Sequence, residues 1–285
     1  MSCWGSLRKT AYLLLPLLIY FVIHDVLQIL LLAVTEQFLQ RGGIAADLIS
    51  EHAATVKGLV SGLSILGGVA VLWKAAESEI GAEDDTGRWK RQESEVVKRN
   101  VLWTRVEKYI LPAVLAFCFS MGLNIVFYQT GFSGSSESYE AVYELQYGVK
   151  FVIGVILYGL VSPLAEEIIF RGLLFQRMKR CFNYRIALIV SSLLFGLYHG
   201  NVVQAVYGTA LGLVIAWSYE LFGDFMVPLL FHAVANISVY TMTYGNRLSE
   251  MKRQNALITA IILLAIGGYL LFWLQMKQNR NQKKE

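Results

Sequence analysis

Long runs of apolar residues, separated by short polar segments, dominate the chain. A helix needs about 20 apolar residues to cross a bilayer, so runs of this kind indicate membrane spans. We expect spans at 11–34, 56–73, 109–128, 147–175, 186–198, 202–219, 225–242 and 256–273. The fifth run is short and polar-edged, but its neighbours connect best if it also crosses. The pattern therefore predicts an all-α, polytopic transmembrane helical bundle with about eight membrane spans.

Two polar segments lie between these spans. Residues 74–108 carry mixed charges and indicate a solvated cytoplasmic connector loop, with a helical pattern near 91–101. Residues 130–140 are rich in Gly and Ser, contain no Lys or Arg, and indicate an outside loop. No internal repeat marks a second domain. We therefore expect residues 1–285 to form a single membrane domain.

Composition supports a membrane protein and argues against two other classes. The chain is 55% hydrophobic and 16% charged, whereas a soluble domain carries about 25% charge. Its net charge of +4 comes from basic residues beside the membrane segments rather than from a basic domain. The lipid bilayer is therefore the expected partner, and nucleic acid is not. Cys3, Cys118 and Cys181 are scattered and predict neither a disulfide framework nor a thiolate metal site.

The distribution of Lys and Arg predicts the orientation of the chain. Cytoplasmic loops of membrane proteins carry an excess of these residues. With both termini in the cytoplasm, 18 of the 25 Lys and Arg residues lie inside and 6 outside, while Arg171 lies within a span. Arg247, Lys252 and Arg253 are the local exception to this bias. We expect an integral protein of a bacterial plasma membrane with both termini cytoplasmic.

Two adjacent glutamates interrupt the fourth apolar run. An ionised carboxylate inside a bilayer costs roughly 2.5 kcal/mol or more, so Glu166 and Glu167 are expected to have a function. On a helix, Glu167 and Arg171 share one face and can pair, whereas Glu166 points about 100° away. Glu166 is then free to act on water. Pro163 can open the helix just before the pair. The alternative is a buried ion pair that only holds the bundle together.

Two histidines lie in later spans. His199 ends the fifth span, and His232 and Asn236 lie one turn apart on the seventh. Together with a glutamate, these side chains could supply a general base, its orienting partner and donors to an oxyanion. They could equally hold a divalent metal with an activated water. Their spacing leaves both chemistries open.

The order and intervals of these residues resemble a known family. The three parts of the pattern are Glu166-Glu167-x-x-x-Arg171, Phe195-x-x-x-His199 and His232-x-x-x-Asn236. They resemble the CPBP intramembrane protease family, which includes the eukaryotic CaaX prenyl endopeptidase and bacterial proteins linked to bacteriocin self-immunity. The resemblance predicts a catalytic core at residues 147–243, and the spans outside it carry no signature.

The resemblance also implies roles for single residues. Glu166 would activate a water, His199 would assist in positioning or proton transfer, and His232 with Asn236 would stabilise the oxyanion. Glu167, Arg171 and Phe195 would support the site. Family members are often called metalloproteases, although a metal-free, glutamate-driven mechanism has also been argued. If a divalent metal such as zinc takes part, its expected ligands are Glu166, His199 and His232.

We therefore expect an intramembrane endopeptidase that cleaves a membrane-associated peptide or protein with a glutamate-activated water. Two alternatives belong to other classes. A non-catalytic bacteriocin-immunity or scaffold protein could share the fold, and it would not need Glu166. An ion-coupled transporter could use the Glu and His residues as a proton relay, but the chain lacks the repeat symmetry of many transporters.

Overall fold

The computed structural model describes residues 5–80, 104–245 and 247–282. Within these ranges all regular structure is helical and no strand is present, which confirms the all-α expectation. Residues 81–103, the middle of the expected connector with its helical pattern, lie outside the described residues, as does Cys3.

The helices follow one another without a break in class. They are α1 (Ser6–Arg41), α2 (Ile44–Glu51), α3 (Ala53–Ile80), α5 (Arg105–Gln129), α6 (Glu137–Tyr147), α7 (Phe151–Ile156), α8 (Ser162–Glu167), α9 (Gln176–Cys181), α10 (Tyr184–Tyr198), α11 (Val202–Phe222), α12 (Met226–Tyr244), α13 (Arg247–Glu250) and α14 (Arg253–Gln282). A 3-10 turn, η1 (Ser133–Ser135), and two π-helical segments, η2 (Leu157–Val161) and η3 (Ile168–Phe175), complete the described structure.

Seven of the described helical segments are long and apolar enough to cross a membrane. They lie in α1, α3, α5, the continuous helix Phe151–Cys181, α11, α12 and α14. The fifth expected span is present as α10, which has 15 residues. At 1.5 Å per residue it is about 22 Å long, shorter than the roughly 30 Å hydrocarbon core of a bilayer.

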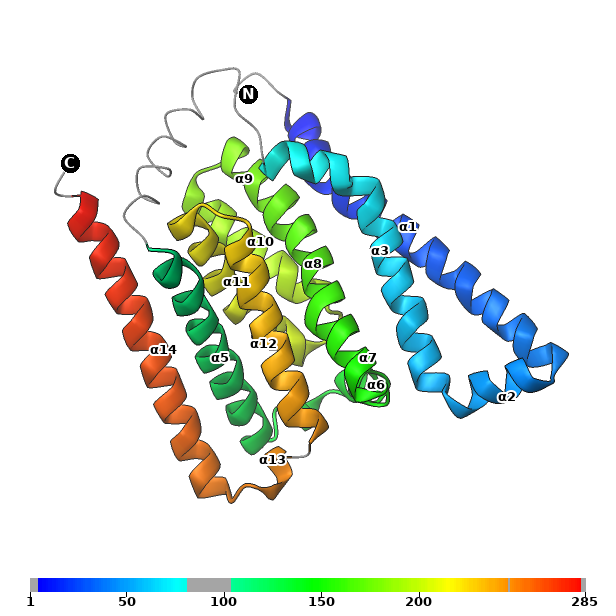
Figure 1. The fold of residues 1–285 in the computed structure, drawn as a ribbon. Coiled ribbons are helices and arrows are strands. Elements are labelled where there is room, and N and C mark those ends of the chain that lie inside the picture. The colour runs from blue at the N-terminus through cyan, green and yellow to red at the C-terminus, as the bar shows by residue number, and fades with distance from the viewer. Residues whose placement is uncertain (1–4, 81–103, 246, 283–285) are drawn as a thin grey trace.

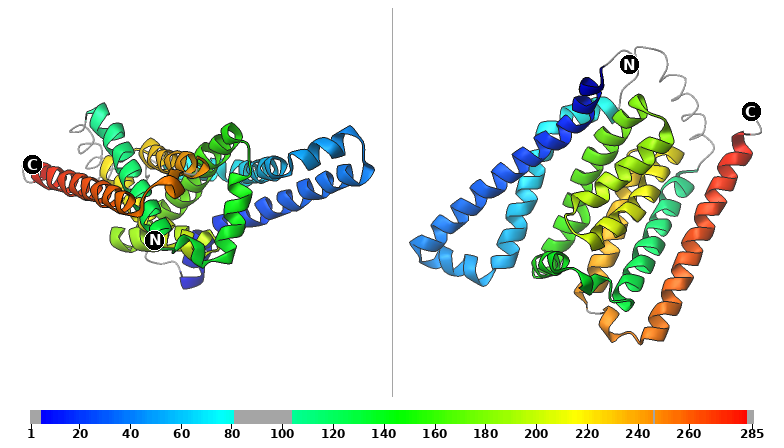
Figure 2. Two further views of the ribbon diagram at one scale, coloured as in Figure 1. Left: turned by 90° about the horizontal axis from the view of Figure 1, so that it is seen from below. Right: turned by 180° about the vertical axis from the view of Figure 1, so that it is seen from behind.

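The long helices stand side by side in one bundle (Figure 1). The start of α1 and the end of α14 lie at the same end of the bundle, which we call the termini end. The helices α2, α6 and α13 lie at the opposite end, the α6 end. From both sides, α1 and α3 form a hairpin that opens towards α2 (Figure 2). The cytoplasmic location of the termini stays a prediction.

The region between the third and fourth spans differs from the expectation. We expected an outside loop at 130–140 and a span that begins at 147. Instead, α6 occupies Glu137–Tyr147 and lies crosswise to the spans (Figures 1 and 2). The helix begins here because the Ser136 hydroxyl accepts a hydrogen bond from the backbone N–H of Tyr139. The following helix begins only at Phe151.

Ion pairs join neighbouring helices at the termini end. They link Arg177 and Arg180 to Glu79, Lys179 to Glu220, and Lys108 to Asp224. Asp224 lies in the turn between α11 and α12. Burial alone raises the pKa of Asp224, but hydrogen bonds from Lys108, the Met226 N–H and Tyr109 outweigh burial and bring that pKa below its usual value. These contacts hold the helices that carry the candidate site in register.

Candidate active site

The two glutamates lie at the end of α8, between the two π-helical segments. Glu166 is 6% exposed and Glu167 is fully buried. The expected break at Pro163 takes the form of η2, which ends directly before α8. Proline lacks the N–H that closes an α-helical turn, so a π-helical turn accommodates it here. Short π-helical segments often occur at functional sites.

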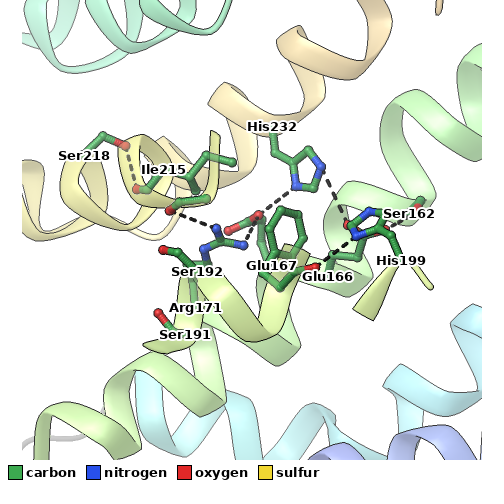
Figure 3. Close-up of polar contacts among 12 residues, drawn as sticks. Ser162, Glu166, Glu167, Arg171, Ser191, Ser192, His199, Ile215, Ser218 and His232 are labelled. Carbon is green, nitrogen blue, oxygen red and sulfur yellow. Dashed lines mark hydrogen bonds and ion pairs between the residues drawn. The ribbon is translucent and has the colours of Figure 1, made fainter. Parts of the chain in front are cut away.

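Glu167 is the centre of a buried charge cluster (Figure 3). Its Oε1 atom accepts hydrogen bonds from Arg171 Nη1 at 3.0 Å and from His232 Nδ1 at 2.7 Å. Arg171, which is 1% exposed, also donates from Nη2 to the Gly212 carbonyl at 3.2 Å. The pairing of Glu167 with Arg171 follows the predicted one-turn spacing. Glu167 thereby connects α8 to α12.

Phe195 packs against three members of the cluster. The Arg171 guanidinium lies over its ring at 4.4 Å from the centroid. The rings of His199 and His232 meet it edge to face, with centroids 5.2 and 5.5 Å away. One aromatic side chain on α10 therefore fixes the positions of one cation and two imidazoles.

Glu166 uses its two carboxylate oxygens differently. Oε1 accepts a hydrogen bond from the Ser162 hydroxyl at 2.5 Å. Oε2 is buried and has no hydrogen-bond partner among the described residues. It lies 3.7 Å from Nε2 of His232 and 3.9 Å from Nε2 of His199 (Figure 3). Both separations exceed a direct hydrogen bond and leave room for a bridging water or ion.

The hydrogen bonds of the histidines define which ring nitrogen faces Glu166. Nδ1 of His199 lies 2.9 Å from the Phe195 carbonyl, which can only accept, so this nitrogen carries a hydrogen. Nδ1 of His232 likewise faces the ion-paired carboxylate of Glu167. In a neutral ring the Nε2 atom then keeps its lone pair. Both Nε2 atoms point towards the unpartnered oxygen of Glu166.

A cavity lies next to these groups. It encloses about 850 Å³, part of it open to the surroundings, and both histidines and Asn236 line it. Asn236 donates one amide hydrogen to the Tyr158 carbonyl at 2.9 Å. A side-chain amide has two hydrogens, so a second remains for a group in the cavity. The cavity gives a substrate access to the candidate residues.

The structure brings the sequence-predicted residues together, with one difference in position. Glu166, Glu167, Arg171, Phe195, His199 and His232 form one connected cluster, whereas Asn236 contacts Tyr158 and faces the cavity. Sequence reasoning missed Ser162, although it precedes Glu166 by one helical turn. It also assigned Gly212 to helix packing alone. The backbone carbonyl that receives Arg171 leaves no side-chain signal in a sequence.

The donor set fits a divalent metal in kind. Tetrahedral zinc ligands at about 2.1 Å from the ion lie roughly 3.4 Å from each other. The 3.7 and 3.9 Å separations around Glu166 Oε2 exceed this by a few tenths of an ångström. Accordingly, no group of three His, Cys, Asp or Glu side chains among the described residues has the geometry of a formed metal site. The metal ligands stay a prediction.

Comparisons with known proteins match the same part of the chain. Residues 148–238 match the family described as Type II CAAX prenyl endopeptidase Rce1-like. Over 167 residues the chain is 29% identical to "Putative membrane peptidase YdiL" of Bacillus subtilis (strain 168), an alignment that covers 57% of this chain and 66% of that protein. The chain thus spans just under two thirds of this relative's length. No solved structure matches the chain significantly.

These matches confirm the family resemblance drawn from the motifs. The matched residues 148–238 contain every candidate site residue, from Glu166 to Asn236. Together with the seven apolar helices, they support an integral membrane protein. The family description and the relative's name both point to a peptidase.

Proposed function

We propose that this protein is an intramembrane endopeptidase in which Glu166 activates a water molecule to cleave a peptide bond. One observation carries the proposal. A buried carboxylate oxygen without a partner faces Nε2 of two histidines across gaps of 3.7 and 3.9 Å, beside a cavity. A purely structural carboxylate would be paired, as Glu167 is with Arg171.

Glu166 acts as the general base. Ser162 holds Oε1, so that Oε2 faces the gap and takes a proton from water placed there. The water oxygen bonds to the peptide carbonyl carbon, and the carbonyl oxygen becomes an oxyanion. Glu166 then returns its proton to the departing amine as the C–N bond breaks. The products are a carboxylate and an amine.

The histidines and Asn236 surround the reacting carbonyl. Nε2 of His199 can accept a hydrogen bond from the attacking water, because Nδ1 is occupied by the Phe195 carbonyl. The free amide hydrogen of Asn236 can donate to the oxyanion. His232 can donate from Nε2 only when both ring nitrogens carry hydrogen, and the Glu167 carboxylate pairs with that charged form.

A metal-dependent version of this site would use the same side chains. Oε2 of Glu166 and Nε2 of His199 and His232 would hold the ion, which would polarise the water and the peptide carbonyl. The two versions differ at His232, whose Nε2 keeps its lone pair in one and carries a hydrogen in the other. In both, Ser162 and Glu167 orient their neighbours as described.

The test is cleavage of quenched fluorescent peptides, prenylated and plain, by the purified protein in detergent. Glu166→Gln retains an acceptor for Ser162 but removes the base, so turnover should fall about 100-fold or more. His232→Ala should also lose turnover. A chelator arm separates the metal-dependent version from the metal-free one.

Glu137→Gln, an exposed glutamate on α6, is the matched control and should keep full turnover. Turnover that survives Glu166→Gln would contradict the mechanism. A biological activity that Glu166→Gln leaves intact, without any peptide cleavage, would favour the non-catalytic alternative instead.

A further inference from the structure

A second cavity adjoins the candidate active site at the α6 end. It encloses about 1250 Å³, and residues of α5, α6, α12 and α13 and of the turn around η1 line it. Asn124, Ser133 and Tyr139 line both this cavity and the one that contains the histidines. The two cavities are therefore neighbours along one path. We call the outer one the vestibule.

The vestibule has an uncompensated negative charge. Glu140 and Glu144 are the charged residues among those that line it, and no Lys or Arg lines either cavity. Neither carboxylate has an ion-pair or hydrogen-bond partner within the described parts of the chain. The inner cavity is lined instead by aromatic and uncharged polar side chains besides its histidines.

The stability of α6 does not account for this charge. The two glutamates are four residues apart on one helix, and like charges at that spacing destabilise a helix. Glu140 lies in the first turn, where a negative charge is favourable. Glu144 lies in the last turn, where it is unfavourable. A cationic ligand between them would remove both penalties.

We propose that the vestibule binds a basic side chain of the substrate. A Lys or Arg near the scissile bond would pair with Glu140 and Glu144, and Tyr139 and Tyr143 would contact its alkyl stem and its charge. The residues next to the scissile bond would be uncharged, to match the inner cavity. This inference rests on the proposed peptidase function. It identifies the substrate as a peptide segment with basic residues that enters from the α6 end.

Binding measurements test the charge preference without turnover. Three fluorescein-labelled peptides of one sequence carry a Lys-Lys, Gln-Gln or Glu-Glu pair. Their affinities for the Glu166→Gln protein in detergent are measured by fluorescence anisotropy. The Lys-Lys peptide should bind most tightly and the Glu-Glu peptide least tightly. Each carboxylate should contribute roughly 1.4- to 5-fold in affinity, and the preference should weaken at high salt.

Variants locate the preference. Glu140→Gln with Glu144→Gln should equalise the three peptides, and Glu140→Lys with Glu144→Lys should invert their order. Glu137→Gln, on the same helix but outside both cavities, should preserve the order.

Equal binding of the three peptides, or a preference that persists in the double glutamine variant, would overturn the proposal. The outcome is independent of catalysis. If the wild type cleaves no peptide, the peptidase proposal fails, while the binding order still decides whether the vestibule selects cations.

Discussion

The Nδ1 atoms of both site histidines are already bound, and this restricts what each ring can do. His199 donates to a backbone carbonyl, which holds its ring in one orientation and one tautomer. His232 faces a carboxylate that is itself paired with Arg171. Neither ring can therefore reverse its roles without breaking a buried hydrogen bond. The chemistry of each histidine passes through Nε2.

The Ser162 hydroxyl gives a prediction at this scale. Ser162→Ala removes the hydrogen bond that orients Glu166, so kcat should fall about tenfold or more, because a hydrogen bond to a charged group contributes about 1.5–3 kcal/mol. The measurement is steady-state cleavage of the best peptide substrate.

Ser218→Ala is the control for this variant. Ser218 is also buried, but its hydroxyl bonds to the Ile215 carbonyl of its own helix, so kcat should not change. A normal kcat for Ser162→Ala would show that Glu166 does not depend on this contact.

Single-residue contacts could be predicted from the sequence where both partners lie on one helix. The Glu167–Arg171 pair follows from a four-residue spacing. The contact between Glu167 and His232 joins residues 65 positions apart, and no local pattern contains it. The acceptor role of Gly212 belongs to its backbone and is invisible in the sequence.

At the scale of elements, α10 and α11 determine where the site residues lie. These helices pack against each other at Gly196, where a Cβ atom would lie 2.4 Å from the Ala205 carbonyl oxygen. No side chain fits at that position without moving one helix. Asn201, which caps α11, also donates to the His199 carbonyl and fixes the turn between them. The close approach sets the positions of Phe195 and His199.

Gly196→Ala should therefore disturb both stability and catalysis. Overpacking of this kind costs about 1–3 kcal/mol, so the melting temperature in detergent should fall by several degrees and turnover should fall with it. Gly268→Ala is the matched control, because nothing lies within 4 Å of a Cβ atom at that position of α14. Equal melting temperatures for the two variants would contradict the packing argument.

The sequence predicted the long helices well and the short ones poorly. Apolar runs of membrane length produced seven of the expected spans, because hydropathy over about 20 residues is a strong signal. The helix α6 was missed, since half of its residues are polar or charged and only its Ser136 cap marks its start. The π-helical segments around the glutamates depend on tertiary packing, and Pro163 alone indicated an irregularity.

At the scale of the whole molecule, both ends of the described chain lie at one end of the bundle, and the vestibule lies at the other. The excess of Lys and Arg predicts that the termini end is cytoplasmic. A substrate that enters through the vestibule would then arrive from outside the cell. Orientation in the membrane thus decides which proteins can be substrates.

Labelling with a membrane-impermeant maleimide tests this orientation in intact cells. In a background without the native cysteines, Ser138→Cys on α6 should react directly, because it is exposed at the α6 end. Ser78→Cys, exposed near the end of α3 at the termini end, should react only after permeabilisation. The opposite result would reverse the topology and direct the vestibule towards the cytoplasm.

The first helix gives the molecule a possible response to its surroundings. With 36 residues, α1 is about 54 Å long, whereas the hydrocarbon thickness of a bilayer is about 30 Å. It lies obliquely to the bundle (Figure 1), as such a mismatch requires. A thinner membrane would increase its tilt. Since the Tyr12 carbonyl accepts a hydrogen bond from Arg177, two turns after the glutamate pair, the lipid composition would act mechanically on the helix that carries Glu166.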